Sequence, residues 1–162
     1  MGCTTTADID SHIVSLEQSG IKSPASFFIL KGNENDYINN IDFNKYSSYL
    51  GETLEKKGWE PVSYGEAKIY LFFEYGIDAF YQSKRRIKPK YDEESGVTSW
   101  VHKDSQIERM VYLRITAADG DDYRLRKKRS VRWDLLVRNP EKAQLSDRIL
   151  IEMINAGSSF LD

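Results

Sequence analysis

The chain has 162 residues, of which 40% are hydrophobic and 30% are charged, so it is long enough for one well-buried core and too short for two. Its net charge of -2 and isoelectric point near 5.8 argue against a general binder of nucleic acids or anionic membranes, which would carry a basic excess. No apolar run approaches the roughly 20 residues that a membrane-spanning helix requires.

Residues 1–24 are predicted to form a tether in front of a single globular domain of residues 25–162. From residue 8 onward this segment is polar with scattered apolar side chains, and Ile13, Val14 and Leu16 are expected to dock on the domain. His12 has no candidate partner nearby in the sequence, so we expect it to be exposed to solvent.

Cys3 is the single cysteine, which leaves no internal disulfide to indicate a redox compartment. Gly2 before it and a polar segment after it are typical of the mature start of a bacterial lipoprotein, whose cysteine is acylated. The first six residues, MGCTTT, also fit the M-G-x-x-x-[ST] pattern for N-myristoylation, with Cys3 as a palmitoylation site. Both chemistries predict a lipid-anchored domain, and an unmodified terminus is the remaining interpretation.

A strand, a helix and two further strands are expected between residues 25 and 75. Residues 25–31 form a short apolar run that ends at a glycine, which predicts the first strand. A helix is predicted over residues 42–57, with Asp42 as its N-cap and Gly58 in the C-cap region. Strands are then expected over 59–63, at a sheet edge because of Pro61, and over 67–75.

Residues 77–106 differ in character from the rest of the domain. A basic run over residues 84–90 is followed at once by Asp92, Glu93 and Glu94, and a short β-like run follows over 97–102. We interpret the segment as an extended hairpin or solvated excursion. His102 has no cysteine or second histidine at metal-ligand spacing, so no metal site is predicted.

The segment from Ile107 to Arg138 is predicted to form a long central hairpin. Its first arm alternates apolar and polar residues, and Asp119-Gly120-Asp121 supplies a reversal. In the second arm, one parity carries the apolar residues expected in the core, with a bulge or an exposed end near Lys127 and Arg129. These apolar residues are Tyr123, Leu125, Val131, Trp133, Leu135 and Val137.

The opposite parity of that second arm carries a row of cations, which is the candidate binding surface of the protein. We expect the row to lie on one exposed face of the sheet, and its members are Arg124, Arg126, Lys128, Arg132 and Arg138. An uncompensated basic groove there would favour binding, whereas interleaved carboxylates would argue against it.

Residues 144–160 have a helical apolar stripe and are predicted to form a C-terminal helix that covers the same sheet face as the first helix. The order of elements predicts an α/β fold of the α+β type. It is expected to be a two-layer sandwich with a mainly antiparallel, twisted sheet and two helices packed on one face.

Catalytic motifs are absent from the sequence. There is no phosphate-binding glycine loop, no G-x-S-x-G elbow and no H-E-x-x-H, and two histidines leave little for a nucleophile–base pair. No cofactor is predicted and no catalytic residue is assigned. Asp119, Asp121 and Asp122 cluster at a turn, where aspartate is common anyway.

Several segments resemble the small envelope lipoproteins of Gram-negative bacteria grouped as domain of unknown function 4136. The likeness rests on pattern and element order between Ala25 and Leu161, and its matching segments are residues 26–30, 54–59, 66–75, 111–116 and 130–133 and the terminal helix. The resemblance implies an acylated Cys3 and a location in the bacterial envelope, at the periplasmic face of a membrane. It implies no known catalytic residues.

Two functions from different classes follow. The first is a lipid-anchored envelope protein with a non-catalytic binding or structural role, whose basic sheet face contacts an envelope protein or an anionic envelope component. Its membrane contact is expected through the lipid anchor only, and nucleic acid is not expected as a partner. The alternative is a small hydrolase or transferase, which would need two carboxylates facing each other in a concave pocket.

Overall fold

The computed structural model describes residues 3–9, 12–18, 24–32, 40–82, 89–92, 94, 96–100, 106–140 and 146–161. Seven strands form one sheet in the order β1-β2-β9-β8-β5-β3-β4, and β6 and β7 form a separate hairpin. The strands are β1 (Cys3–Ile9), β2 (His12–Gln18), β3 (Ser26–Lys31), β4 (Glu60–Pro61), β5 (Ile69–Gln82), β6 (Pro89–Asp92), β7 (Val97–Trp100), β8 (Gln106–Asp119) and β9 (Val131–Asn139). The helices are α1 (Asn40–Glu55), α2 (Gly120–Arg126) and α3 (Asp147–Ser158), with short 3₁₀ turns at η1 (Tyr64–Glu66) and η2 (Ser159–Leu161).

The sheet is mixed, and most of its strand pairs are antiparallel. β3 pairs in parallel with both β4 and β5, because the chain crosses over through α1 before it returns to the sheet. β5 and β8 form the longest pair, from Ile69 opposite Asp119 to Gln82 opposite Gln106.

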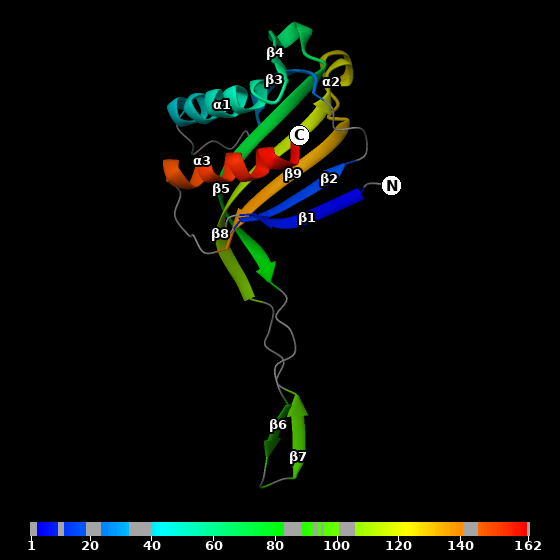
Figure 1. The fold of residues 1–162 in the computed structure, drawn as a ribbon. Coiled ribbons are helices and arrows are strands. Elements are labelled where there is room, and N and C mark those ends of the chain that lie inside the picture. The colour runs from blue at the N-terminus through cyan, green and yellow to red at the C-terminus, as the bar shows by residue number, and fades with distance from the viewer. Residues whose placement is uncertain are drawn as a thin grey trace.

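Helices α1 and α3 lie side by side on one face of the sheet, as Figure 1 shows, and the core fills the space between the two layers. Alternate residues of the central strands point into this layer, including Leu71, Leu113 and Leu135, and each is fully buried. Leu50 and Leu54 of α1 and Leu150 of α3 close the core from above. The predicted two-layer α+β sandwich is therefore confirmed.

The helix ends follow from the local sequence. After α1, Gly58 adopts a φ of 90°, a left-handed conformation that costs glycine little, and the Trp59 N–H donates to the Leu54 carbonyl at 3.1 Å. α3 begins at Ser146, whose hydroxyl accepts a hydrogen bond from the Ile149 N–H. Both helices were predicted, with boundaries that differ by two or three residues.

Asp147 joins the two covering helices. It accepts hydrogen bonds from Lys45 and from the Tyr46 hydroxyl of α1. The hydrogen bond from Lys45 is the main reason that the pKa of Asp147 lies below its usual range. Burial, together with the nearby Asp147 carboxylate, raises the pKa of Tyr46 above its usual range.

The predicted central hairpin is correct in its first arm and from Val131 onward in its second, and it is wrong for residues 120–126, which form a helix. β8 runs to Asp119, but the chain then forms the helix α2 instead of a tight turn, and β9 begins only at Val131. Tyr123 and Leu125 therefore belong to a helix and not to a strand. Trp133, Leu135 and Val137 are buried as predicted, whereas Val131 is 46% exposed and Leu125 is 83% exposed.

Of the bulge or exposed end expected near Lys127 and Arg129, the structure has the exposed segment there, and a β-bulge lies a few residues further on. The register between β8 and β9 shifts between Ala117 and Ala118, which pair with Trp133 and Val131. Arg132 is the additional residue. Arg132 lies at the start of β9, where the chain enters the sheet after α2.

The predicted tether of residues 1–24 is wrong for residues 3–9 and 12–18, because these form β1 and β2 of the sheet. β2 pairs with β9, from Ile13 opposite Arg138 to Gln18 opposite Trp133. Val14 and Leu16 are fully buried members of the core, and so is His12, whose ring nitrogen Nε2 lies 4.0 Å from the Glu152 carboxylate. The expectation that His12 is solvent-exposed was wrong.

The two edges of the sheet differ. One edge is β4, which has two residues, one of them Pro61, so it offers little for another strand to pair with. This agrees with the predicted edge position. The other edge is β1, whose seven residues pair only with β2.

A second, smaller cluster lies on the sheet face opposite α1 and α3. Tyr70, Phe72, Ala67 and Ala118 are buried there, and Tyr123 of α2 packs on them. The face away from the two main helices is thus covered at the end where α2 lies (Figure 1).

Residues 77–106 contain a hairpin, as predicted: β6 pairs antiparallel with β7, and Figure 1 shows it beyond the far end of β5 and β8. The predicted basic run is only partly tested, since residues 84–88 lie outside the described residues, and so does His102. In the described part of the chain, no helix is both long and apolar enough to cross a membrane.

Candidate functional site

The candidate site lies at the end of the sheet where α2 joins β8 to β9. We call residues 124–132 the basic tip. Asp119 caps α2 by accepting a hydrogen bond from the Asp122 N–H at 3.1 Å. Lys127 then adopts a φ of 52° and ends the helix, and its N–H donates to the carbonyls of Asp122 and Tyr123.

The five cations of the predicted binding surface do not form one row. Arg124 and Arg126 lie on α2, and Lys128 lies in the connection to β9. Arg132 is the additional residue at the bulge, and Arg138 lies near the far end of β9, beside Tyr112 of β8. The helix rotates its side chains by about 100° per residue, so the alternation expected for a strand is lost.

Carboxylates are interleaved with three of these cations. Arg124 pairs with Asp121 at 2.7 Å and Arg126 with Asp122 at 3.8 Å. Arg132 pairs with Asp119, the residue that caps α2. These interleaved carboxylates are the arrangement expected to argue against binding through the five cations as one row.

The cations of the basic tip contact aromatic side chains of the neighbouring sheet face and of α2. Arg124 donates to the Ala67 carbonyl and to the Tyr70 hydroxyl, the latter at 3.3 Å. The Lys127 ammonium lies 5.3 Å from the Tyr123 ring centroid, and the Arg129 guanidinium lies 3.9 Å from that of Phe72. Such cation–π contacts are worth about 0.5–1 kcal/mol each at exposed sites, so they help to fix the loop that follows α2.

Asp119 gives the tip a dependence on pH. Its hydrogen bond from Arg132, and then that from the Asp122 N–H, hold its pKa below the usual range. A carboxylate whose pKa is lower in the folded state stabilises the protein above its unfolded-state pKa of about 3.9. That contribution is lost as the pH falls below about 4 and passes through the folded-state pKa.

We therefore expect Asp119→Asn to flatten the loss of stability with acid. Asparagine still caps a helix, so at neutral pH the variant loses the charge interaction with Arg132 and keeps the cap. Asp119→Ala loses both, and should be less stable than Asp119→Asn by about 1 kcal/mol at pH 7. Urea denaturation midpoints measured from pH 7 downward test this. If the midpoint fell equally steeply with pH in Asp119→Asn and in the wild type, the expectation would be contradicted.

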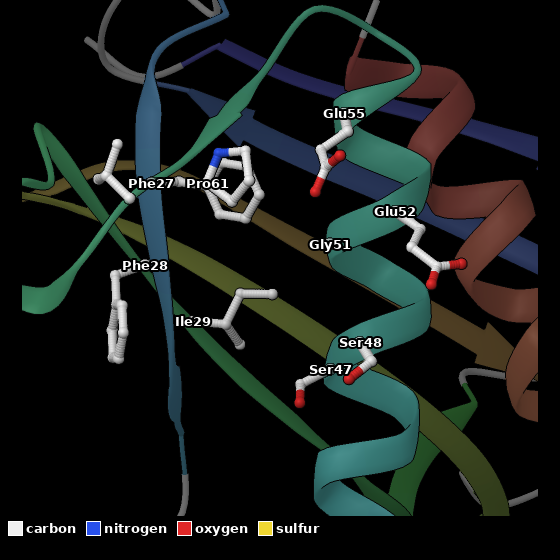
Figure 2. A pocket seen from close by; sticks show the side chains of 10 residues that line it. Phe27, Phe28, Ile29, Ser47, Ser48, Gly51, Glu52, Glu55 and Pro61 are labelled. Atoms are coloured by element: carbon white, nitrogen blue, oxygen red, sulfur yellow. The ribbon is translucent and has the colours of Figure 1, made fainter.

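A groove of about 420 Å³ lies between α1 and the β3–β4 edge (Figure 2). Apolar side chains of β3 and β4, including Phe27, Ile29 and Pro61, form one wall. The other wall is α1, which contributes Glu52 and Glu55 and a flat strip at Gly51. The volume is within the range of small-molecule sites, but the groove is open to solvent along its length.

The groove does not provide the acid pair that the enzymatic alternative needs. Glu52 and Glu55 come from successive turns of one helix and do not face each other across the groove (Figure 2). Ser47 and Ser48 also line it, but without a histidine among its described lining residues. Within the described ranges, no group of three or more potential ligands is arranged to hold a metal ion.

Cys3, the predicted lipidation site, is exposed and begins the edge strand β1. It pairs with Gln18, which in turn pairs with Trp133 two residues after the start of β9. Cys3 therefore lies at the same end of the sheet as the basic tip, separated from β9 by one strand.

Comparisons with known proteins give a fold and no family. No protein-family model and no curated protein matches the chain. A solved PDZ domain protein from Parabacteroides distasonis matches with a TM-score of 0.52 and 12% identity, over 91% of this chain and 35% of that chain. A PelC dodecamer from Paraburkholderia phytofirmans matches with a TM-score of 0.43 and 12% identity, over 99% of this chain and 97% of that one. The chain thus spans about a third of the first of these proteins, and the likeness concerns the fold alone.

Sequence reasoning placed Arg124 and Arg126 on the candidate surface but missed the helix α2 that carries them, and it left Lys127 and Arg129 out of the surface. A signal for this helix was present: Asp119 is followed three residues later by Asp122, a capping arrangement, and the next residues are good helix formers. The alternation of apolar and basic residues from Tyr123 onward concealed it, because a seven-residue helix is too short to show its own period clearly.

Proposed function

We propose that this protein is a lipid-anchored protein of the bacterial envelope with a non-catalytic binding or structural role. The observation that carries the proposal is Cys3, which is exposed at the start of an edge strand and would be accessible to an acyltransferase. Its N-terminal sequence and the resemblance to envelope lipoproteins support the same interpretation. The protein would lie at the periplasmic face of a membrane.

Cys3 is the first residue of a strand of the main sheet, so an anchor on it would be attached directly to the folded domain. β1 pairs with β2 over all seven of its residues, and β2 contributes Val14 and Leu16 to the core. Acyl chains on Cys3 would therefore hold the sheet close to the bilayer in a restricted orientation, instead of on a long flexible tether. Stable attachment needs two membrane contacts, such as two acyl chains or one acyl chain with a basic patch.

Mass spectrometry of the protein expressed from its native gene, together with membrane fractionation, tests the proposal. We expect an acylated Cys3 and recovery in the membrane fraction, and we expect Cys3→Ser to move the protein into the soluble fraction. Thr5→Ser is a matched control, because it changes an exposed residue of the same strand and leaves the cysteine in place. An unmodified Cys3 in a soluble wild-type protein would overturn the anchoring.

The described residues that could form an acid site do not favour the enzymatic alternative. The groove beside α1 lacks facing carboxylates among its described lining residues, and the clustered aspartates at α2 cap a helix or pair with arginines.

A further inference from the structure

We propose that the basic tip docks on a bilayer surface that carries anionic phospholipids. This inference deepens the proposed function, since it names what the binding surface contacts, and it rests on that function for its biological setting. The surface differs from the predicted row of five cations. Its central residues are Lys127, Lys128 and Arg129, flanked by Leu125 and Val131.

The tip has an excess of positive charge after its internal ion pairs are formed. Residues 119–132 contain six cations and three carboxylates, and each carboxylate pairs with one arginine. The three remaining cations are consecutive, exposed residues, Lys127 to Arg129. Within the described part of the chain, none of these three lies within ion-pair distance of a carboxylate. The chain as a whole is acidic, so this local excess also gives the molecule a preferred orientation toward a negative surface.

Exposed apolar side chains flank these cations on both sides. Leu125 is 83% exposed and Val131 is 46% exposed, and these are among the few large apolar residues on the described surface. Leu125 lies on α2 with its side chain away from the aromatic cluster that Tyr123 enters. Cations beside exposed apolar side chains suit the boundary between headgroups and acyl chains, where the cations meet phosphates and the apolar groups leave water.

The tip is held in a defined conformation before it binds. Lys127 ends α2 in a left-handed conformation and lies over Tyr64 and Tyr123, and Arg129 stacks on Phe72. Each cation contacts the face of an aromatic ring and still remains exposed to solvent. Less side-chain and loop entropy is therefore lost when the tip meets a charged surface.

A flat bilayer fits this surface better than an acidic protein segment would. The tip is a short helix and a loop that project from the end of the sheet (Figure 1). A peptide partner would favour a concave site, and the groove beside α1 is lined by none of the tip residues. Phospholipid headgroups offer many phosphates in one plane, which a projecting cluster of three cations can contact together.

The position of Cys3 is consistent with the same orientation. Cys3, Gln18 and Trp133 lie in one row across β1, β2 and β9. Neighbouring strands are about 4.8 Å apart, which places the Cys3 backbone about 10 Å from the strand that leaves the tip. An acyl anchor and the basic tip would thus reach one membrane surface. A single acyl chain binds only reversibly, and a basic patch supplies the second contact that stable attachment needs.

The test uses the full chain with Cys3→Ser, so that acylation contributes nothing to the measurement. Binding is measured by co-sedimentation with vesicles of phosphatidylcholine and phosphatidylglycerol, and with vesicles of phosphatidylcholine alone. We expect binding to the anionic vesicles only, weakening as salt is added, because salt screens charges across an exposed contact.

Charge variants then locate the contact. Each lysine or arginine near an anionic membrane contributes about 1 kcal/mol, so Lys128→Gln with Arg129→Gln should weaken vesicle binding about 30-fold. The matched control is Arg109→Gln with Arg148→Gln, which removes the same net charge at exposed positions outside the tip and should bind nearly as the parent. Leu125→Ser should weaken binding about tenfold, since one apolar side chain no longer leaves water.

Each outcome bears on the proposal. Equal binding to neutral and anionic vesicles, unchanged binding by the tip variant, or equal losses in the tip and control variants would each overturn it. Circular dichroism and thermal unfolding of both double variants show whether a loss reflects misfolding, and Leu125→Ser gives a second test at a residue without an interior role. A negative result in the vesicle experiment would not contradict acylation of Cys3. An unmodified Cys3 would not contradict vesicle binding by the tip.

Discussion

Replacing Trp133 by alanine should lower the free energy of unfolding by about 3–5 kcal/mol. Trp133 is 1% exposed at the centre of the core, and its ring meets the edge of Trp59 with centroids 6.1 Å apart. It also pairs with Ala117 beside the β-bulge, so β8 has only a small side chain there to fill the space left by the indole. Urea denaturation at neutral pH measures the change as a lower midpoint.

Leu136→Ala is the control for this substitution. Leu136 lies on the same strand, on the opposite face of the sheet from the two covering helices, and is only partly buried. Leu136→Ala should lower the free energy of unfolding by about 1 kcal/mol or less. Similar losses for Trp133→Ala and Leu136→Ala would mean that the space between sheet and helices is not the principal core.

Gly120→Ala should destabilise the protein by about 3 kcal/mol or more, which is large for one methyl group. A β-carbon at this position would lie 2.3 Å from the Ala67 carbonyl oxygen and 2.7 Å from that of Lys68. Both obstacles are backbone atoms, and the Gly120 N–H donates to the Lys68 carbonyl at 2.8 Å, so neither side can move without breaking the contact. Thermal and urea unfolding would report the loss.

Gly51→Ala provides the matched comparison, because it adds the same methyl group inside α1. A β-carbon there meets only Ile29 Cδ1, at 3.9 Å, which is an ordinary contact. Alanine favours a helix over glycine by about 1 kcal/mol, so this variant should be more stable than the wild type. If the Gly120 variant were as stable as the Gly51 variant, the close approach of α2 to the Ala67–Lys68 backbone before β5 would be refuted.

The layers of the fold could be predicted because each covering element has a clear period. The apolar stripe of α1, with Tyr46, Leu50 and Leu54, and that of α3 both indicate helices with one buried face. Strands β5, β8 and β9 alternate strongly enough to place Leu113 and Leu135 in the core. Pro61 correctly indicated an edge.

The errors came from segments where two patterns compete. Residues 12–18 read HIVSLEQ, with too few apolar residues to suggest a strand, yet a half-buried strand needs only alternate positions such as Val14 and Leu16. His12 occupies the first of these positions, so burial of the strand buries it as well. At α2 the helix is set by its cap at Asp119 and by packing of Tyr123, neither of which follows from alternation.

The candidate surface was only partly predictable for the same reason. The basic residues of this segment can be counted in the sequence, but their ion-pair partners depend on the orientation of α2. Pairing with Asp119, Asp121 and Asp122 removes three arginines from the excess, and leaves the consecutive cations that the row prediction had divided between its two faces. A net charge of -2 for the whole chain does not describe this local field.

The β5–β8 pair is so long that charges at its two ends hardly influence each other. Fourteen paired residues at about 3.4 Å each extend for about 45 Å between the α2 end and the end nearest the β6–β7 hairpin. Charges in water at physiological ionic strength are screened over about 8 Å. Ionic contacts made at the α2 end therefore leave the potential at the other end nearly unchanged, so the effect of a charge substitution at one end can be interpreted independently of the other end.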